Sequence, residues 1–426
     1  MKNIKDSVVG KRLMLLGGVG DACDIVKQAH NLGIEVYETD YLVDSPAKAI
    51  VDKSFMTSCT DVPAVVDLCK RENVDGAFTG YTDSLLPFAQ RICAELNFPF
   101  WGDEKNIKMC VDKELFKTAC ENAGVPVIPS RCVDEKSYAG VAITGPVVVK
   151  PVDNSGSRGV FKCYSQAEYL DSCQRAFSYS KKKVLSVERL MDLNAEFSVY
   201  YLLYNGEAYM VGMGDRYVSS PNPNTAPRAL GMRFPSLKMD LFLEKMDSKI
   251  RHFFSLNGMK NGFVFLQGFC EGEEFFINEI GYRLNGGFTY KVAEKYTGVN
   301  VVHLLLQYSL TGVMDASLLS RITPHFEGVG FLLTLTVKNG TIGNVCGIEE
   351  INAHRNIYEF CQLKFVGSTV AAETGTSAQV FAYAIITAKD CNELRDVINF
   401  VKQHIKVFDK NGDSMLNQIV DASAVK

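Results

Sequence analysis

Three side chains with complementary chemistry lie close together in a block that runs from Gly262 to Gly287. Gln267, Glu279 and Arg283 stand in or just beyond two apolar runs, which are joined by a polar turn at residues 270–274. Two such runs predict a β-hairpin that brings Gln267 close to Glu279. A carbonyl oxygen, a carboxylate and a guanidinium at one place suit a polyphosphate that carries Mg²⁺. The block therefore predicts a site for magnesium-bound ATP.

A second candidate element would cover the phosphates. The apolar strand expected at residues 145–151 contains Lys150 near its end, and the small-residue loop DNSGSRG follows at residues 153–159. The backbone N–H groups of such a loop can surround phosphate oxygens, and a lysine adds a positive charge. The loop is not a Walker A motif, because GxxxxGK[ST] is absent. An ordinary hairpin turn is the alternative interpretation.

Two glutamates are candidates for reading the rest of a nucleotide. Glu188 ends the apolar run 184–188, where exposed backbone and a carboxylate can bond the edge of adenine. Glu196 follows and can accept hydrogen bonds from ribose hydroxyls. The alternative for each is a solvated strand residue.

The N-terminal part must supply a scaffold for these groups. Strand-like runs at residues 12–16, 35–38 and 76–79 alternate with helical patterns, which predicts a parallel βαβαβ sheet. The glycines at 17–20 suggest a tight turn rather than a dinucleotide fingerprint, because the GxGxxG spacing is incomplete. Asp40 is accordingly a weak ribose candidate.

Substrate-binding candidates come from loops and strand ends. Tyr81 and Asp83 follow a strand of the parallel sheet, where ligands often bind, and Arg216 ends a later strand. Arg228 and Arg233 lie in a polar stretch at residues 219–235, where either a bound carboxylate or a solvated loop face is expected.

The second half of the chain predicts further mixed structure. A helix is expected at 237–257 before the Gly262–Gly287 block. The last hundred or so residues predict an α+β unit with a hairpin, in which strands 328–338 and 341–348 meet at Asn339-Gly340. A strand at 380–387 and a helix to about His404, capped by Asp390 or Asn392, complete it. The predicted fold class is thus α/β and α+β with several domains.

Composition restricts the partners and the compartment. The 426 residues are 47% hydrophobic, which is ample for large cores, and the net charge of −4 argues against nucleic acid. No apolar run approaches the ~18 residues of a membrane span, and the N-terminus lacks a signal-peptide pattern. The thirteen cysteines are scattered without a CxxC pair, which predicts reduced cysteines in a cytoplasmic protein rather than a disulfide or zinc framework.

The order of these elements resembles the ATP-grasp superfamily of carboxylate–amine ligases, in particular the branch with biotin carboxylase, carbamoyl phosphate synthetase and the amino-acid ligases. The resemblance covers almost the whole chain. It implies a pre-ATP-grasp domain at residues 1–110, an ATP-grasp domain at 111–312 with a lid at about 125–187, and a C-terminal α+β domain at 313–426.

The resemblance also implies roles for individual residues. Lys113 and Lys150 would bind phosphates, Gln267 and Glu279 the metal, and Arg283 the transferred phosphate or the acyl phosphate. The remaining nucleotide contacts would be Ser155, Gly156, Ser157 and Gly159 in the flap, Glu188, Arg189 and Leu190 at adenine, and Glu196 at ribose.

Two positions depart from the family pattern. The first metal position is often glutamate but is Gln267 here, and the position two beyond Glu279 is often asparagine but is Gly281. Asn285 could compensate by binding metal or substrate. A pseudo-ligase that binds nucleotide without turnover is therefore one alternative.

The implied activity is a ligation in which ATP phosphorylates a carboxylate and an amine attacks the acyl phosphate, with Mg²⁺ or Mn²⁺ as the metal. The substrates would be a small carboxylate and an amine, with an amino acid or small metabolite expected as the acid. An enzyme that activates bicarbonate or formate is the other alternative. A homodimer is expected only from the family.

Overall fold

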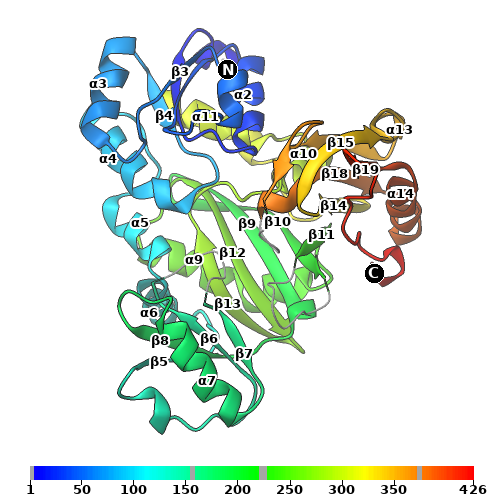
Figure 1. The fold of residues 1–426 in the computed structure, drawn as a ribbon. Coiled ribbons are helices and arrows are strands. Elements are labelled where there is room, and N and C mark those ends of the chain that lie inside the picture. The colour runs from blue at the N-terminus through cyan, green and yellow to red at the C-terminus, as the bar shows by residue number, and fades with distance from the viewer. Residues whose placement is uncertain (1–3, 154–158, 220–227, 372–376) are drawn as a thin grey trace.

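The computed structural model describes residues 4–153, 159–219, 228–371 and 377–426. Its N-terminal part is a four-stranded parallel sheet with the order β3-β2-β1-β4, which confirms the predicted parallel sheet (Figure 1). The short edge strand β3 was not predicted. The elements are α1 Ile4–Val8, β1 Arg12–Leu16, α2 Ala22–Asn31, β2 Glu35–Thr39, β3 Lys53–Phe55, α3 Val62–Glu72, β4 Gly76–Phe78, α4 Leu86–Leu96 and α5 Glu104–Val111.

Helix α6 (Lys113–Asn122) leads to a small antiparallel sheet with the order β5-β8-β6-β7. One helix, α7, packs on this sheet around Tyr169 and Cys173, which are both fully buried (Figure 1). A lid was expected at about residues 125–187, and that role of the unit stays a prediction. Its elements are β5 Ser130–Asp134, β6 Val147–Pro151, β7 Phe161–Cys163, α7 Gln166–Phe177 and β8 Val184–Arg189.

The centre of the molecule is an eight-stranded sheet with the order β13-β12-β9-β10-β11-β14-β18-β16. The predicted helix at 237–257 is present as two helices that meet at Met246. The elements of this part are β9 Glu196–Tyr204, β10 Glu207–Val218, β11 Ala229–Phe234, α8 Met239–Lys245, α9 Asp247–Leu256, β12 Gly262–Glu271, β13 Glu274–Gly281, α10 Tyr290–Thr297, α11 Val301–Thr311 and α12 Ala316–Leu319.

Three C-terminal strands, β14, β16 and β18, extend this same central sheet. The remaining C-terminal strands form a separate sheet with the order β17-β15-β19. Helix α14, which Asp390 caps as expected, packs against β14 and β18 of the central sheet. The elements are β14 Val329–Thr336, β15 Gly340–Cys346, α13 Ile348–Ala353, β16 Ile357–Gln362, β17 Thr369–Val370, β18 Val380–Ala388, α14 Cys391–His404 and β19 Lys406–Asp409.

The predicted hairpin at 328–348 is wrong. Strand β14 pairs with β11 and β18, whereas β15 pairs with β17 and β19 in the other sheet. Both edges of β14 are thus occupied by strands distant in sequence, so the chain turns at Gly340 (φ +133°) into a different sheet. Asn-Gly is a local signal and does not report which long-range partners compete for the strand.

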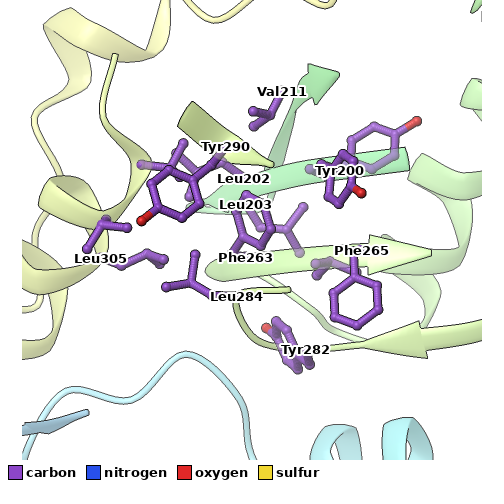
Figure 2. Packing of buried hydrophobic residues seen from close by; sticks show 14 of the residues in the cluster. Tyr200, Leu202, Leu203, Val211, Phe263, Phe265, Tyr282, Leu284, Tyr290 and Leu305 are labelled. Atoms are coloured by element: carbon purple, nitrogen blue, oxygen red, sulfur yellow. The ribbon is translucent and has the colours of Figure 1, made fainter. Parts of the chain in front are cut away.

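The main hydrophobic core joins the central sheet, on which α10 packs, to the N-terminal part, where α11 packs against β4, α1 and α2. Figure 2 shows aromatic and leucine side chains from β9 and β12 packed beside Tyr290 of α10 and Leu305 of α11. Trp101, before α5, donates its indole N–H to the carbonyl of Tyr282 at 3.0 Å and ties the N-terminal part to this core. The continuous core keeps the parallel sheet beside the part of the central sheet where β12 begins and β13 ends.

Two other predictions concern the chain as a whole. All thirteen cysteines are free thiols, and several are buried. In the described part of the chain no helix has the length and apolar character needed to cross a bilayer.

Candidate active site

Strands β12 and β13 form the predicted hairpin, and Gln267 lies directly opposite Glu279. A bulge follows at Gln267/Gly268, so that Asn278 has no partner of its own in the register. Both Gln267 and Glu279 line a cavity of about 340 Å³. Within the described residues the Glu279 carboxylate forms no ion pair and accepts no hydrogen bond from a side chain, so it remains available for a cation.

The Phe265 ring explains why position 281 is glycine. Gly281 is the register partner of Phe265. A Cβ at position 281 would lie only 2.1 Å from an edge carbon of that ring. The aromatic ring covers the glycine, an arrangement that stabilises strand glycines. An asparagine ligand at 281 is therefore incompatible with Phe265 in its present position. The hairpin instead offers two adjacent side chains with oxygen donors, Gln267 and Glu279.

Substitution Gly281→Ala should lower the free energy of unfolding by about 1–3 kcal/mol, the typical cost of an overpacked core site. The change is measured by chemical denaturation. Gly145→Ala is the matched control, because a Cβ there meets nothing within 4 Å. Gly281→Ala should cost less free energy of unfolding when it is added to Phe265→Leu than when it is made in the wild type, because the ring that it would contact is then absent. If Gly281→Ala is as stable as Gly145→Ala, Phe265 does not determine the residue at 281.

Arg283, just past β13, is held by three groups. Its guanidinium forms a bidentate ion pair with Asp83, including a 2.7 Å bond from Nε to Oδ1. It also donates to the carbonyl of Leu284 at 2.7 Å and lies 5.1 Å from the ring centre of Phe265. Asp83 and Arg283 were predicted as separate site residues, 200 positions apart, and the structure brings them into direct contact.

Two lysines, Lys117 of α6 and Lys150 of β6, flank Glu188 of β8. Lys150 Nζ lies 2.6 Å from Oε2 of Glu188, and Lys117 Nζ donates to Oε1 at 2.7 Å. Lys117 also donates to the hydroxyl of Ser130 at 2.7 Å. Burial alone would raise the pKa of Glu188, but the two lysines outweigh it and hold that pKa below its ordinary value. Glu188 is thus a charged, buried carboxylate between two cations.

Lys117 was not predicted from the sequence. Asp112 caps α6 by accepting from the amides of Glu114 and Leu115, so Lys113 is the first residue of that helix. Lys117 lies one turn later on the same face. This i,i+4 spacing was the available signal, but nothing local indicated that Glu188, 71 residues away, would complete the pair.

Lys113, the first residue of α6, has a pKa that is shifted by its surroundings. Burial and the charge of Lys150 lower the pKa of Lys113, while the carboxylates of Glu279 and Glu188 oppose that shift. The pKa of Lys113 therefore depends both on Lys150 and Glu188 of the small antiparallel sheet and on Glu279 of β13. Two lysines predicted to bind phosphates, Lys113 and Lys150, and the predicted metal ligand Glu279 therefore influence one another electrostatically.

Substitution Lys117→Met should raise the KM for ATP about 10-fold with a smaller change in kcat, because Glu188 then retains only Lys150 as its cation. It should also reduce stability, since one partner of a buried pair is removed. Lys117→Met/Glu188→Gln should be less stable than Lys117→Met, because Glu188→Gln removes the carboxylate partner of the largely buried Lys150. Lys108→Met, at an exposed position on α5, is the control. An unchanged KM and unfolding temperature would contradict this role for Lys117.

The other predicted nucleotide residues are placed as follows. The amides of Arg189 and Leu190 donate to the carbonyls of Pro129 and Pro146, at 3.3 and 3.0 Å, so those two donors are engaged. Glu196 forms an ion pair with Arg216. Ser155, Gly156 and Ser157 lie outside the described residues. Gly159 adopts φ +76°, and a Cβ there would approach Tyr179. The nucleotide roles of all these residues stay predictions.

The cavity brings together some of the predicted substrate residues. Arg216, Arg283 and Asn285 all line it, and Asn285 accepts a 2.8 Å bond from Thr289. Tyr81 does not line the cavity. Its hydroxyl is buried, its ring packs edge-on against Phe288, and burial raises its pKa well above the ordinary value.

The glycine turn after β1 reaches the site through Asp21, which sequence reasoning missed. The amide of Gly287, a cavity residue, donates to Asp21 Oδ2 at 3.3 Å. Burial raises the pKa of Asp21 to about 6. Asp40, the weak ribose candidate, instead accepts from the amides of Gly18 and Leu42. The turn residues thus organise the interface between the N-terminal part and the hairpin.

Comparison with known proteins gives relatives of partial length. No family model matches the sequence. A formate-dependent phosphoribosylglycinamide formyltransferase of Sulfurisphaera tokodaii is 24% identical over 204 residues, which are 46% of this chain and 50% of the relative. The corresponding enzyme of Stenotrophomonas maltophilia is 30% identical over 165 residues, 37% of this chain and 41% of the relative. The chain thus spans about half the length of these curated relatives or less.

Solved structures match over nearly the whole chain. A phosphoribosylglycinamide synthetase from Anaerococcus prevotii has a TM-score of 0.76 at 18% identity and covers 94% of this chain and 100% of its own. An L-amino acid ligase from Bacillus licheniformis has a TM-score of 0.75 at 18% identity, with 94% and 99% covered. The biotin carboxylase domain of a Hydrogenobacter thermophilus 2-oxoglutarate carboxylase has a TM-score of 0.76 at 18% identity, with 95% and 91% covered. The chain therefore has the ATP-grasp fold, which confirms the resemblance found in its sequence.

Proposed function

We propose that this protein is an ATP-dependent ligase that activates a carboxylate as an acyl phosphate and transfers the acyl group to an amine. The observation that carries the proposal is the position of Gln267 opposite Glu279 in a cavity that Arg283 also lines, with the Lys150–Glu188 ion pair on the small antiparallel sheet. The ATP-grasp fold supports it, because proteins of this fold include ligases. Lysines beside an unpaired carboxylate suit a triphosphate with its cation.

The residues at the hairpin fit Mg²⁺ held largely by nucleotide phosphates. Mg²⁺ prefers oxygen donors and retains waters and phosphate oxygens, so one or two protein ligands suffice. Gln267 and Glu279 would be those ligands. Within the described residues no group of three or more His, Cys, Asp or Glu side chains could hold an ion without other ligands. When bound, Mg²⁺-ATP supplies the phosphoryl group.

The chain's own contribution to the reaction is electrostatic and positional. Lys113 and Lys150 neutralise charge on the phosphates, and Arg283 stabilises the charge that develops on the transferred phosphoryl group. Asp83 orients Arg283 through the bidentate pair. Closure of the lid over the cavity would exclude water, which otherwise hydrolyses an acyl phosphate.

Formate is a second candidate for the activated acid. The observation that favours it is the sequence similarity to formate-dependent phosphoribosylglycinamide formyltransferases, which extends over 204 residues in one relative. Formate would leave the cavity beyond Arg283 free for the amine. The same site residues would serve either acid.

The test is ADP release from Mg²⁺-ATP with a panel of carboxylic acids, including formate and bicarbonate, in the presence of hydroxylamine. Hydroxylamine converts an acyl phosphate to a hydroxamate, which reports activation of an acid without knowledge of the natural amine. Stoichiometric ADP and hydroxamate with one class of acid is the expected result. ATP binding without either product across the panel would overturn the ligase proposal and favour a pseudo-ligase.

A further inference from the structure

The cavity extends far beyond the hairpin. Its lining residues come from seven of the eight strands of the central sheet, from Glu279 on β13 to Val380 and Tyr383 on β18. Three strand steps separate β12, which carries Gln267, from β11, and they amount to about 14 Å along the sheet. Gln267 and Glu279 occupy only one end, so the opposite end can accommodate a second molecule or the far part of a substrate.

Three arginines line this cavity, and two of them already have carboxylate partners. Arg283 is paired with Asp83, and Arg216 is paired with Glu196. Arg228, immediately before β11, forms no ion pair within the described residues. Its Nε is buried and has no hydrogen-bond partner in that part of the chain. A buried guanidinium N–H without an acceptor costs free energy, and a bound ligand oxygen would relieve that cost.

A second unpartnered polar atom lies in the same part of the cavity. Thr336 is 6% exposed and lines the cavity, and its buried hydroxyl has no partner within the described residues. The β11–β14 register ends with Gly231 opposite Leu333, and Arg228 and Thr336 both line the cavity beyond that pair. A cationic donor and a hydroxyl donor thus line the part of the cavity remote from Glu279.

We propose that Arg228 and Thr336 bind the carboxylate of the amine substrate, which is therefore an amino acid or a short peptide. This inference rests on the proposed ligase function and assigns the substrate class of the same site. Arginine recognises carboxylates through charge-assisted hydrogen bonds, and the threonine hydroxyl supplies one more donor. The volume of about 340 Å³ is at the low end for small-molecule sites, which suits a ligand of this size.

The charge balance favours a carboxylate over a phosphate group. The only described cavity cation without a carboxylate partner is Arg228, and Glu279 contributes a negative charge to the same cavity. One guanidinium neutralises a monoanionic carboxylate, whereas a phosphate monoester at neutral pH carries a charge of about −1.5 to −2. The charge of this site therefore favours an amine substrate that carries a carboxylate over one that carries a phosphate group.

The experiment compares amines within each variant. Hydroxylamine, free amino acids, their C-terminal amides and a phosphate-bearing amine are each supplied with Mg²⁺-ATP and the activated acid, and kcat/KM is measured from ADP release. Wild type should prefer free amino acids over the amides. Arg228→Gln should lower kcat/KM for amino acids about 10- to 100-fold more than it lowers kcat/KM for hydroxylamine. Arg228→Lys should retain part of the preference because it keeps the charge.

The controls separate this inference from the proposed function. Arg355→Gln, at a side chain that is 86% exposed, removes the same charge outside the cavity and should not change the preference for amino acids. Absence of hydroxamate in the wild type with every acid overturns the ligase function itself. Hydroxamate formation with an equal loss for all amines in Arg228→Gln, or a preference for the phosphate-bearing amine, overturns the carboxylate site alone. Unfolding temperatures of the variants verify that each is folded.

Discussion

Glu279→Gln is expected to lower ADP release at least about 100-fold at millimolar Mg²⁺, and part of the loss should be recovered at higher Mg²⁺. Glu279 is the one carboxylate of the proposed metal pair, and Gln267 and the ring over Gly281 offer no replacement charge. A metal ion supplies several kcal/mol of charge stabilisation in phosphoryl transfer, and each 1.36 kcal/mol changes the rate tenfold. The dependence of the rate on Mg²⁺ concentration and calorimetric titration with Mg²⁺-ATP measure the effect.

Glu274→Gln is the matched control for this experiment. Glu274 is on the same strand as Glu279 and is also exposed, but it lies at the other end of β13 and does not line the cavity. It should leave both the rate and the Mg²⁺ dependence at wild-type values. Equal behaviour of the two variants would show that Glu279 is not a metal ligand.

Arg283→Lys should lower kcat about 100-fold, although the charge is retained. Lysine lacks the planar fork that bonds Asp83 bidentately and cannot stabilise a phosphoryl group in the same geometry. Asp83→Asn should have a smaller effect, of about 10-fold, because Arg283 keeps its bond to the Leu284 carbonyl and its contact with Phe265. Single-turnover formation of hydroxamate measures these changes without a contribution from product release.

Arg251→Lys serves as the comparison for Arg283→Lys. Arg251 also pairs with an aspartate, Asp247, at 2.7 Å, but it is on α9 and does not line the cavity. A loss in Arg251→Lys as large as that in Arg283→Lys would mean that the effect is structural. A larger loss in Asp83→Asn than in Arg283→Lys would assign Asp83 a direct role in place of a positioning one.

The sequence predicted local elements better than their partners. The hairpin of β12 and β13 was predictable because the two strands are joined by a short polar turn, so that few registers are available. The Asn339-Gly340 turn was an equally strong local signal, but the hairpin that it predicted is wrong. Strand β14 is paired on both edges, by β11 and β18. The difference lies in competition from strands that are distant in the chain, which no local pattern reports.

The candidate site shows the same division. The residue types and order of Lys113, Lys150, Glu188, Gln267, Glu279 and Arg283 were sufficient to predict the ATP-grasp fold, which comparison with solved structures confirmed. The ion pairs of Lys117 with Glu188 and of Asp83 with Arg283 join residues 71 and 200 positions apart. Neither pairing has a sequence signal, because the two partners lie far apart in the chain.

What the sequence by itself determined was many of the local elements, the parallel N-terminal sheet and the pairing of Gln267 with Glu279, because hydrophobic periodicity and short turns act over few residues. Only the tertiary structure decided which charges are neutralised. Burial brings carboxylates to Arg216 and Arg283 but leaves Arg228 without one among the described residues. The need to compensate buried charge arises only when distant segments pack together, so the substrate end of the cavity was decided at that level.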